Sequence, residues 1–133
     1  MSLKKLNGLG ADVIERLKSA GIRTSGKLLD AAKTLQGRKA LARQTGIDAK
    51  RLLRFANIAD KLRVKGLGQG YAELLSHAGV DTVRELKYRN PEKLAAAMRK
   101  KNEKLKLVRL VPTEKAVGRW IEEARKLPQE ISY

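Results

Sequence analysis

The stretch VKGLGQGYAELLSHAGVDT, residues 64–82, places three glycines at the start of a run with the composition of a helix. Because glycine adopts positive φ angles that other residues avoid, Gly66-Leu67-Gly68 predicts a tight turn. The following residues favour a short helix over 69–78, and Gly79 stands where a helix C-terminal stop is expected. Thr82 is a suitable N-cap for a further helix. The stretch therefore predicts a turn followed by two short helices.

The same pattern occurs earlier in the chain, at a constant offset of 58 residues. Residues 6–29 (LNGLGADVIERLKSAGIRTSGKLL) align without a gap to residues 64–87 (VKGLGQGYAELLSHAGVDTVRELK). The nine identical positions, in the numbering of the first copy, are Gly8, Leu9, Gly10, Glu15, Leu17, Ala20, Gly21, Thr24 and Leu28. Identities at a single offset indicate a duplicated unit. We expect two tandem units, over residues 1–63 and 64–133, in one compact body with a pseudo-two-fold repeat.

The remaining segments of both units are predicted to be helical. Residues 37–45 form a helix that Gly46 stops, and a longer helix follows over 48–63. In the second unit one helix runs over 91–104 and a last one over 114–127. Leucine, alanine, lysine, arginine and glutamate dominate, and aromatic residues make up only 4% of the chain. These features favour helix over sheet, so we expect an all-α fold.

The composition indicates a folded core beneath a strongly basic surface. Of the 133 residues 42% are hydrophobic, and 30 Lys and Arg against 14 Asp and Glu give a net charge of +16. Such self-repulsion favours a partner with many negative charges, and nucleic acid is the first to consider. An acidic membrane also fits the charge, but a helical core requires the same amphipathic helices that a membrane would. We therefore expect no membrane partner.

Several other classes are excluded or disfavoured. The absence of cysteine excludes disulfides and thiolate metal sites. The one histidine, His77, has no second histidine with which to share a metal, so we expect neither a metal nor a cofactor. No apolar run approaches the ~18 residues that span a bilayer, and the first ten residues contain no apolar signal core. These features favour a cytoplasmic protein.

A Gly-hydrophobic-Gly turn between helices, followed by Ala-Gly-hydrophobic-x-Thr, resembles the helix-hairpin-helix motif. The residues that carry the resemblance are Gly66-Leu67-Gly68, Ala72, Leu75, Ala78-Gly79-Val80 and Thr82, and in the first copy Gly8-Leu9-Gly10, Ile14, Leu17, Ala20-Gly21-Ile22 and Thr24. Nearly the whole chain is also similar to a family known as a domain of unknown function, through Gly37-Arg38, Thr45-Gly46-Ile47, Asn57, Ala59-Asp60, Gly66 and Asn90-Pro91. The first resemblance implies tandem helix-hairpin-helix units that bind DNA without sequence preference.

The candidate contact residues lie in the two turns and in one basic segment. A Gly-Leu-Gly turn leaves backbone N–H groups uncovered at the positive end of a helix. A phosphate oxygen can accept hydrogen bonds from these groups. The expected nucleic-acid-binding residues are Lys65, Gly66, Gly68, Gln69 and Gly70 in the second turn, Gly8 and Gly10 in the first, and Arg99, Lys100, Lys101, Lys104 and Lys106 in the basic segment. We expect the second turn to bind more strongly, because Asp12 follows the first turn and competes with a phosphate.

Other interpretations of the same features stay open. The turns can simply connect helices in a protein-interaction module that recruits an acidic partner, and the basic segment can be a solvated helix end. RNA fits the charge as well, although we expect duplex DNA ahead of it. The scattered aromatic residues, among them Tyr88, are expected in the core rather than in a single-strand platform. A further cluster around Arg38-Lys39 and Arg43 is expected on the surface.

Catalysis is the least favoured interpretation. Asp81 follows a glycine turn, as the catalytic aspartate does in base-excision glycosylases, but the gap from Gly68 is short and the chain is too small to enclose a flipped base. Asp81 and Thr82 are better explained as a turn residue and a helix cap. We expect a protein that is not an enzyme.

Overall fold

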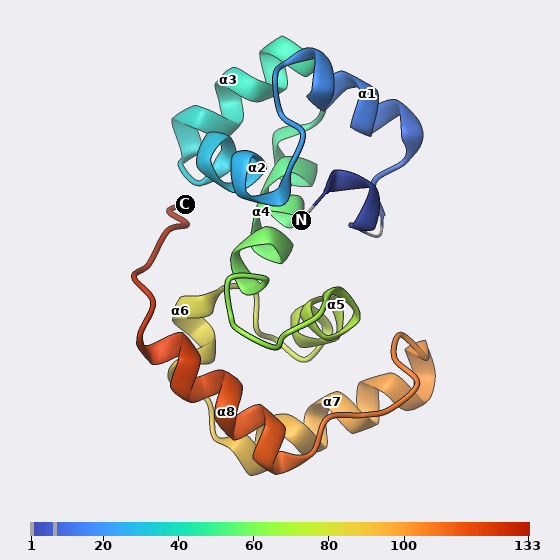
Figure 1. Ribbon diagram of the computed structural model, residues 1–133, viewed down its shortest axis with the longest axis vertical. Coiled ribbons are helices and arrows are strands. Elements are labelled where there is room, and N and C mark those ends of the chain that lie inside the picture. Colours follow the sequence, from blue (N-terminus) through green and yellow to red (C-terminus); the bar gives the residue numbers. More distant parts are fainter. Residues whose placement is uncertain (1, 7) are drawn as a thin grey trace. The chain divides into compact units, whose positions relative to one another are not determined.

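The computed structural model describes residues 2–6 and 8–133, and regular secondary structure in these residues is helical apart from an isolated bridge between Ser2 and Thr24 (Figure 1). The elements in chain order are a 3-10 helix η1 (Leu3–Lys5), α1 (Ala11–Ser19), α2 (Ser25–Ala32), α3 (Leu35–Thr45), α4 (Ala49–Lys61), α5 (Gln69–His77), α6 (Val83–Leu86), α7 (Pro91–Leu105) and α8 (Glu114–Arg125). The all-α prediction is confirmed.

The chain forms two compact units, one of Met1–Asp60 with Glu130–Tyr133 and one of Lys61–Gln129. In the first unit α2 packs against α3, and α1 packs against α3. Its buried apolar side chains include Leu3, Leu6, Val13, Leu17, Ile22, Leu28, Leu29, Leu41 and Ile47. The C-terminal segment joins this core, because Ile131 is buried and the Ser132 N–H donates to the Lys33 carbonyl at 2.8 Å. The sequence patterns did not reveal this return of the chain end.

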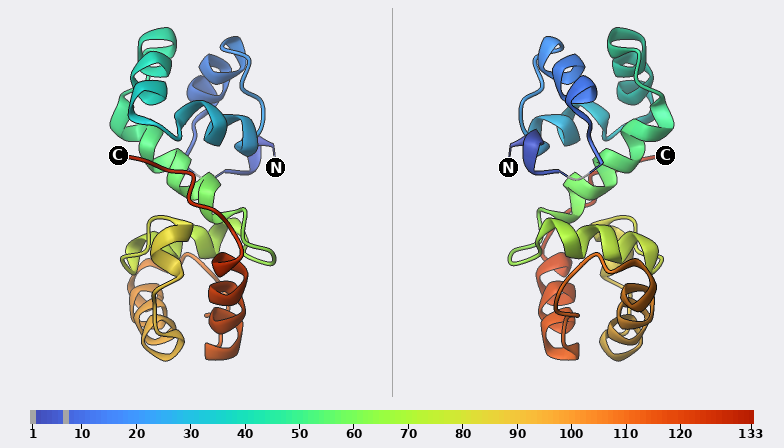
Figure 2. Two further views of the ribbon diagram at one scale, coloured as in Figure 1. Left: turned by 90° about the vertical axis from the view of Figure 1, so that its left-hand side faces the viewer. Right: turned by 90° about the vertical axis from the view of Figure 1, so that its right-hand side faces the viewer.

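In the second unit α7 and α8 lie side by side, and α5 crosses next to them (Figure 2). α6 packs against α8, and α5 packs against α7. The buried apolar side chains include Val64, Leu67, Leu74, Leu75, Val80, Leu86, Leu94, Met98, Val117, Trp120 and Ile121. The last helix thus packs within its own unit, alongside the turn and helix that repeat the first copy.

Helix boundaries follow local capping signals. The side chains of Thr24, Thr34, Thr82, Asn90 and Thr113 each accept a hydrogen bond from a backbone N–H in the helix that they begin. Each cap satisfies an N–H that would otherwise lack an acceptor, and a cap of this kind contributes about 1 kcal/mol. These local signals explain why the helices begin within two residues of the predicted positions.

The core of the second unit contains one buried charge. Lys61 is fully buried at the position that Leu3 occupies in the first copy. Its ammonium group donates to the Ser76 hydroxyl and to the Val80 carbonyl, the latter at 3.0 Å. Because a buried ammonium is costly without acceptors, these bonds tie the end of α4 to the end of α5 and the residues after it.

Among the described residues, no helix combines the length and the apolar composition that crossing a membrane requires.

Candidate functional site

The two Gly-Leu-Gly turns have nearly identical backbones. Gly8 and Gly66 both have φ of +84°, and the N-cap glycines Gly10 and Gly68 are extended, with φ/ψ of −71°/164° and −84°/173°. The match continues at the offset of 58 residues through α1 and α5. Both helices span nine residues and are followed by a glycine of positive φ, Gly21 at +85° and Gly79 at +94°. The repeated sequence therefore specifies a repeated local structure.

The three glycines at the start of the second copy have three different structural roles. Gly66 is required by its positive φ, which an L side chain adopts only with strain. Gly70 is favoured by packing, because a Cβ there would lie 3.0 Å from the Val108 side chain, which is tighter than an ordinary contact. Gly68 is required by neither: its φ is ordinary, and no described heavy atom lies within 4 Å of the position that a Cβ would take. The backbone at Gly68 is therefore open to an outside partner.

The helix start at Gly68 offers unused hydrogen-bond donors. Gly68 has no side chain with which to cap α5, and the first bond of the helix runs from the Ala72 N–H to the Gly68 carbonyl at 3.0 Å. The N–H groups of Gln69, Gly70 and Tyr71 precede that bond and have no acceptor within the helix. The Gln69 side chain is engaged with Glu73 at 2.9 Å, so this residue offers its backbone and not its amide.

A groove of about 370 Å³ runs beside the second turn. Its lining residues are Lys65, Gly66, Arg119, Trp120, Glu122 and Glu123. Arg119, an exposed cation on α8, lines the groove together with Lys65. The sequence patterns did not indicate Arg119, because it lies 54 residues from Lys65 in the chain. Glu122 and Glu123 bring negative charge to the same groove, but each is paired with a nearby cation. Glu122 pairs with Arg125 at 2.8 Å, and Glu123 pairs with Lys126, the C-cap of α8, at 3.4 Å.

The first turn has different surroundings. Gly8 and Gly10 are exposed, and Leu9 is half-buried, whereas the equivalent Leu67 is only 5% exposed. Asp12 lies in the first turn of α1 and pairs with Arg16 at 3.2 Å. Both side chains of this pair are well exposed, so a negative charge stands close to the helix start. The central leucine is therefore fully buried in the second turn only.

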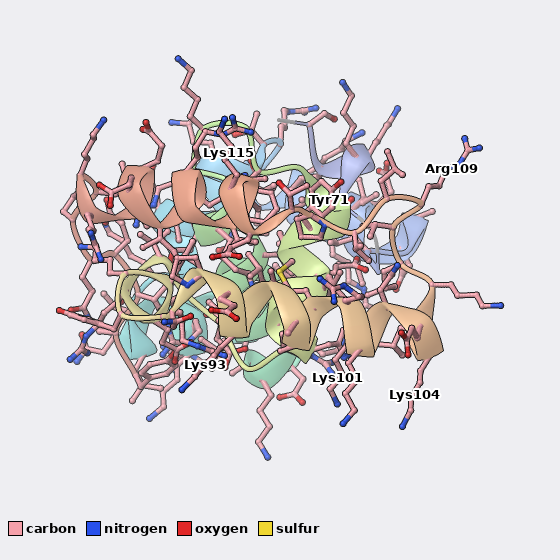
Figure 3. The ribbon with its side chains drawn as sticks, turned by 90° about the horizontal axis from the view of Figure 1, so that it is seen from below. Tyr71, Lys93, Lys101, Lys104, Arg109 and Lys115 are labelled. Atoms are coloured by element: carbon pink, nitrogen blue, oxygen red, sulfur yellow. The ribbon has the colours of Figure 1, made fainter. Side chains whose placement is uncertain are left out.

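The basic residues of the segment 99–109, which we call the cationic segment, are all on the surface. Arg99, Lys100, Lys101, Lys104, Lys106 and Arg109 are exposed. The first four lie on the C-terminal half of α7, and Lys106 and Arg109 lie in the loop that leads to α8. Figure 3 shows Lys101 and Lys104 on the side of α7 that faces away from α8, with Arg109 projecting from the end of the unit.

The loop after α7 is held in place by specific bonds. The Asn102 side chain accepts from the Val108 N–H and donates to the Val108 carbonyl, both at 3.0 Å. Lys106 ends α7 in the left-handed conformation with φ of +52°, and its N–H donates to the Asn102 carbonyl at 2.8 Å. Glycine is the usual residue at such a position, so lysine here carries a conformational cost.

The cationic segment and the second turn meet at the first turn of α5. The Val108 side chain fills the space above Gly70, and the Tyr71 hydroxyl donates to the Leu110 carbonyl at 2.9 Å. Tyr71 also packs on Trp120, with ring centroids 5.2 Å apart. The loop that ends the cationic segment therefore packs against the start of α5.

Two predictions about side-chain placement are wrong. Arg38 is not on the surface: it is 3% exposed and donates to the Ala32 carbonyl at 2.9 Å and to the Ser132 carbonyl at 2.7 Å. Burial lowers the pKa of its guanidinium from the usual value, and Tyr133 acts in the opposite direction. Tyr88, which lies just after the four-residue helix α6, is not in the core but is 81% exposed. By contrast, Thr82 caps α6 as predicted.

The fold defines an all-helical protein of two compact units, each containing a Gly-Leu-Gly turn before a nine-residue helix. The chain belongs to the family described as a domain of unknown function (DUF4332), whose family model matches residues 7–127. No curated protein and no solved structure matches the sequence significantly.

Proposed function

We propose that this protein binds nucleic acid, with duplex DNA ahead of RNA, through the sugar-phosphate backbone and without sequence preference. The contact surface consists of the second turn, the start of α5 and the cationic segment. The single observation that carries the proposal is the meeting of these features at Gly70 and Tyr71, against Val108 and Leu110. In this proposal the two Gly-Leu-Gly turns are helix-hairpin-helix hairpins, and the protein binds without catalysing a reaction.

The first supporting step concerns the donors of the second turn. The N–H groups at the start of α5 point out of the helix end, where the helix dipole supplies a partial positive charge. A phosphate oxygen accepts hydrogen bonds from these N–H groups, and its negative charge is attracted to the helix end. Because the space around Gly68 is open, a sugar-phosphate backbone can approach the peptide closely. A serine or threonine at Gly68 would cap the helix at least as well, so glycine there is better explained by an outside partner than by stability.

The second supporting step concerns charge. Exposed lysines and arginines of the cationic segment extend the positive region along α7, and Lys65 and Arg119 flank the turn itself. Cations spread along a helix neutralise successive phosphates, which supplies affinity that falls steeply with salt. Because phosphate contacts position a protein without reading bases, this surface supports sequence-independent binding.

The test is fluorescence anisotropy with a labelled DNA duplex, titrated at several salt concentrations. A scrambled duplex, a single strand and an RNA duplex of the same length are the comparison ligands. We expect micromolar binding to both DNA duplexes alike, weaker binding to the others, and a steep dependence of log affinity on log salt. Absence of binding at low salt, despite a net charge of +16, would refute the proposal.

A second candidate function is a module that recruits an acidic protein partner. The observation that favours it is Tyr88, because an exposed tyrosine between Lys87 and Arg89 is a typical anchor of protein interfaces. Replacing Tyr88 with serine separates the two candidates. DNA affinity should change less than twofold if the second turn and the cationic segment make the contact.

A further inference from the structure

The loop between α7 and α8 displays a large apolar side chain on a surface that is otherwise cationic. Leu110 is 77% exposed, the highest exposure of any aliphatic side chain among the described large hydrophobic residues, and Leu105 at the end of α7 is 42% exposed. The residues around them in the sequence, Lys104, Lys106 and Arg109, are exposed cations. Figure 3 shows Lys104 and Arg109 projecting from this end of the unit.

The exposure of Leu110 is a property of an ordered loop. The Leu110 carbonyl accepts a hydrogen bond from the Tyr71 hydroxyl at 2.9 Å, and the ring of Tyr71 packs on the buried Trp120. Two residues earlier, Val108 is fixed by both of its backbone bonds to Asn102 and by its packing above Gly70. The loop is thus anchored on both α5 and α7.

The exposed leucine and the cations around it restrict the chemistry of the partner. A partner of this loop must present negative charge to the surrounding cations and an apolar space to the leucine. A nucleic-acid duplex provides both within a few ångströms, because phosphates border each groove and the faces of stacked bases are apolar. Proteins that bend DNA insert leucine and similar side chains between base steps in this way.

We propose that Leu110 acts as a wedge that enters a groove of the bound duplex and inserts between two adjacent base pairs. This inference rests on the proposed function, and it adds a structural preference. Unstacking a base step costs a few kcal/mol in an intact duplex, and less where the step is already weakened. The protein therefore binds a duplex with a mismatch or a one-nucleotide gap more tightly than an intact duplex.

The experiment compares Leu110→Ser with Leu35→Ser. Leu35 is a leucine at the start of α3 in the first unit and is 44% exposed, so its replacement makes the same chemical change away from the loop. The probes are an intact duplex and a gapped duplex, each carrying 2-aminopurine at the same position, which in the gapped duplex borders the gap. Because Leu110 is 77% exposed, its replacement should not alter the thermal unfolding temperature, which is measured for each variant.

For the wild-type protein we expect about tenfold tighter binding to the gapped duplex and a rise in 2-aminopurine fluorescence as its neighbour is unstacked. Leu110→Ser should lose the preference and the fluorescence rise but keep the salt dependence of binding to the intact duplex. Leu35→Ser should behave as the wild type.

The opposing outcomes are distinct. If Leu110→Ser keeps the preference and the fluorescence rise, the wedge is refuted while DNA binding stands. If the wild-type protein binds neither duplex at low salt, both the wedge and the proposed function are refuted. Vesicles of phosphatidylserine and phosphatidylcholine form the last arm: if Leu110→Ser weakens vesicle binding and leaves both DNA affinities unchanged, the loop is a membrane contact and the wedge is refuted.

Discussion

The two glycine turns have the same backbone but different neighbours. Gly8 and Gly66 share a φ of +84°, and Gly10 and Gly68 share an extended conformation with open space around each. Yet the helix after the first turn begins with Asp12, paired with Arg16, whereas the helix after the second begins beneath the loop that follows α7. Local structure is therefore a property of the repeated sequence, and we propose that binding depends on what each unit adds around its turn.

The same contrast occurs at the helices that follow. α3 and α7 both end in a left-handed residue whose N–H donates four residues back at 2.8 Å, but this residue is Gly46 in the first unit and Lys106 in the second. Glycine is the stable choice at such a position, and lysine adds charge at a conformational cost. The second unit thus gives up local stability at Lys106 in a place where a cation serves the proposed surface.

The largest expected effect comes from removing the positive charge of the cationic segment. Replacing the five predicted basic residues Arg99, Lys100, Lys101, Lys104 and Lys106 with glutamine should lower DNA affinity by about a hundredfold, and the salt slope should fall by about 0.9 for each phosphate that the variant no longer neutralises. Salt-dependent anisotropy measures both quantities. The matched control replaces five exposed cations of the first unit, Lys27, Lys39, Arg43, Lys50 and Arg54. Equal reductions in the two variants would show that total charge, and not its location, governs binding.

Arg38 tests whether basic residues of the first unit serve structure. Arg38→Met leaves the Ala32 and Ser132 carbonyls without their donor, so we expect a loss of about 2 kcal/mol in the free energy of unfolding. Urea denaturation measures this, and the exposed neighbour in Lys39→Met should change stability by less than about 0.5 kcal/mol. DNA affinity of the folded Arg38 variant should stay within twofold of wild type. A large loss would indicate that the binding surface lies on the first unit.

The equivalence of the two turn backbones predicts equal costs for equal changes. Gly8→Ala and Gly66→Ala each force a Cβ into a left-handed conformation, which costs about 1–2 kcal/mol. Urea denaturation of the two variants should give the same loss within error. A difference of more than about 1 kcal/mol would mean that the turns differ in strain, contrary to their matching dihedral angles.

Lys106→Gly should separate stability from binding. Glycine removes the strain that a side chain has at positive φ, so we expect the free energy of unfolding to rise by about 0.5–1 kcal/mol. Removal of the charge should lower DNA affinity a few-fold. Lys106→Asn is the control, since asparagine tolerates the left-handed region and also removes the charge. Both variants should bind equally weakly. Unchanged affinity in both would exclude Lys106 from the contact surface.

The features that could be predicted from the sequence are those with local causes. Thr24, Thr82 and Asn90 cap helices within three residues, and Gly46 stops α3 through its own φ. The residues that form such a signal lie within a few positions of one another, so a short sequence pattern contains all of them. The helix boundaries and the duplicated turn follow from them.

The features that escaped prediction depend on distant partners. Arg38 is buried because the Ser132 carbonyl, 94 residues later, accepts one of its bonds. Gly70 is a predicted contact residue, and the sequence did not reveal that the Val108 side chain packs against it. The joining of the cationic segment to the second turn likewise requires the packing of α5 on α7. No short pattern contains these interactions, and they decide which glycines and which cations remain available to a partner.

The central claim is that the open backbone at Gly68 contacts the DNA and that the equivalent position in the first turn, Gly10, does not. Threonine is the most direct probe, because it caps a helix about as well as glycine and suits the extended conformation of both positions, yet adds a branched side chain. The measurement is the DNA affinity of Gly68→Thr and Gly10→Thr at one salt concentration, with unfolding temperatures recorded for both. The account predicts a loss of about tenfold for Gly68→Thr, less than twofold for Gly10→Thr, and no loss of stability in either. Equal affinities in the two variants, both close to wild type, would contradict it.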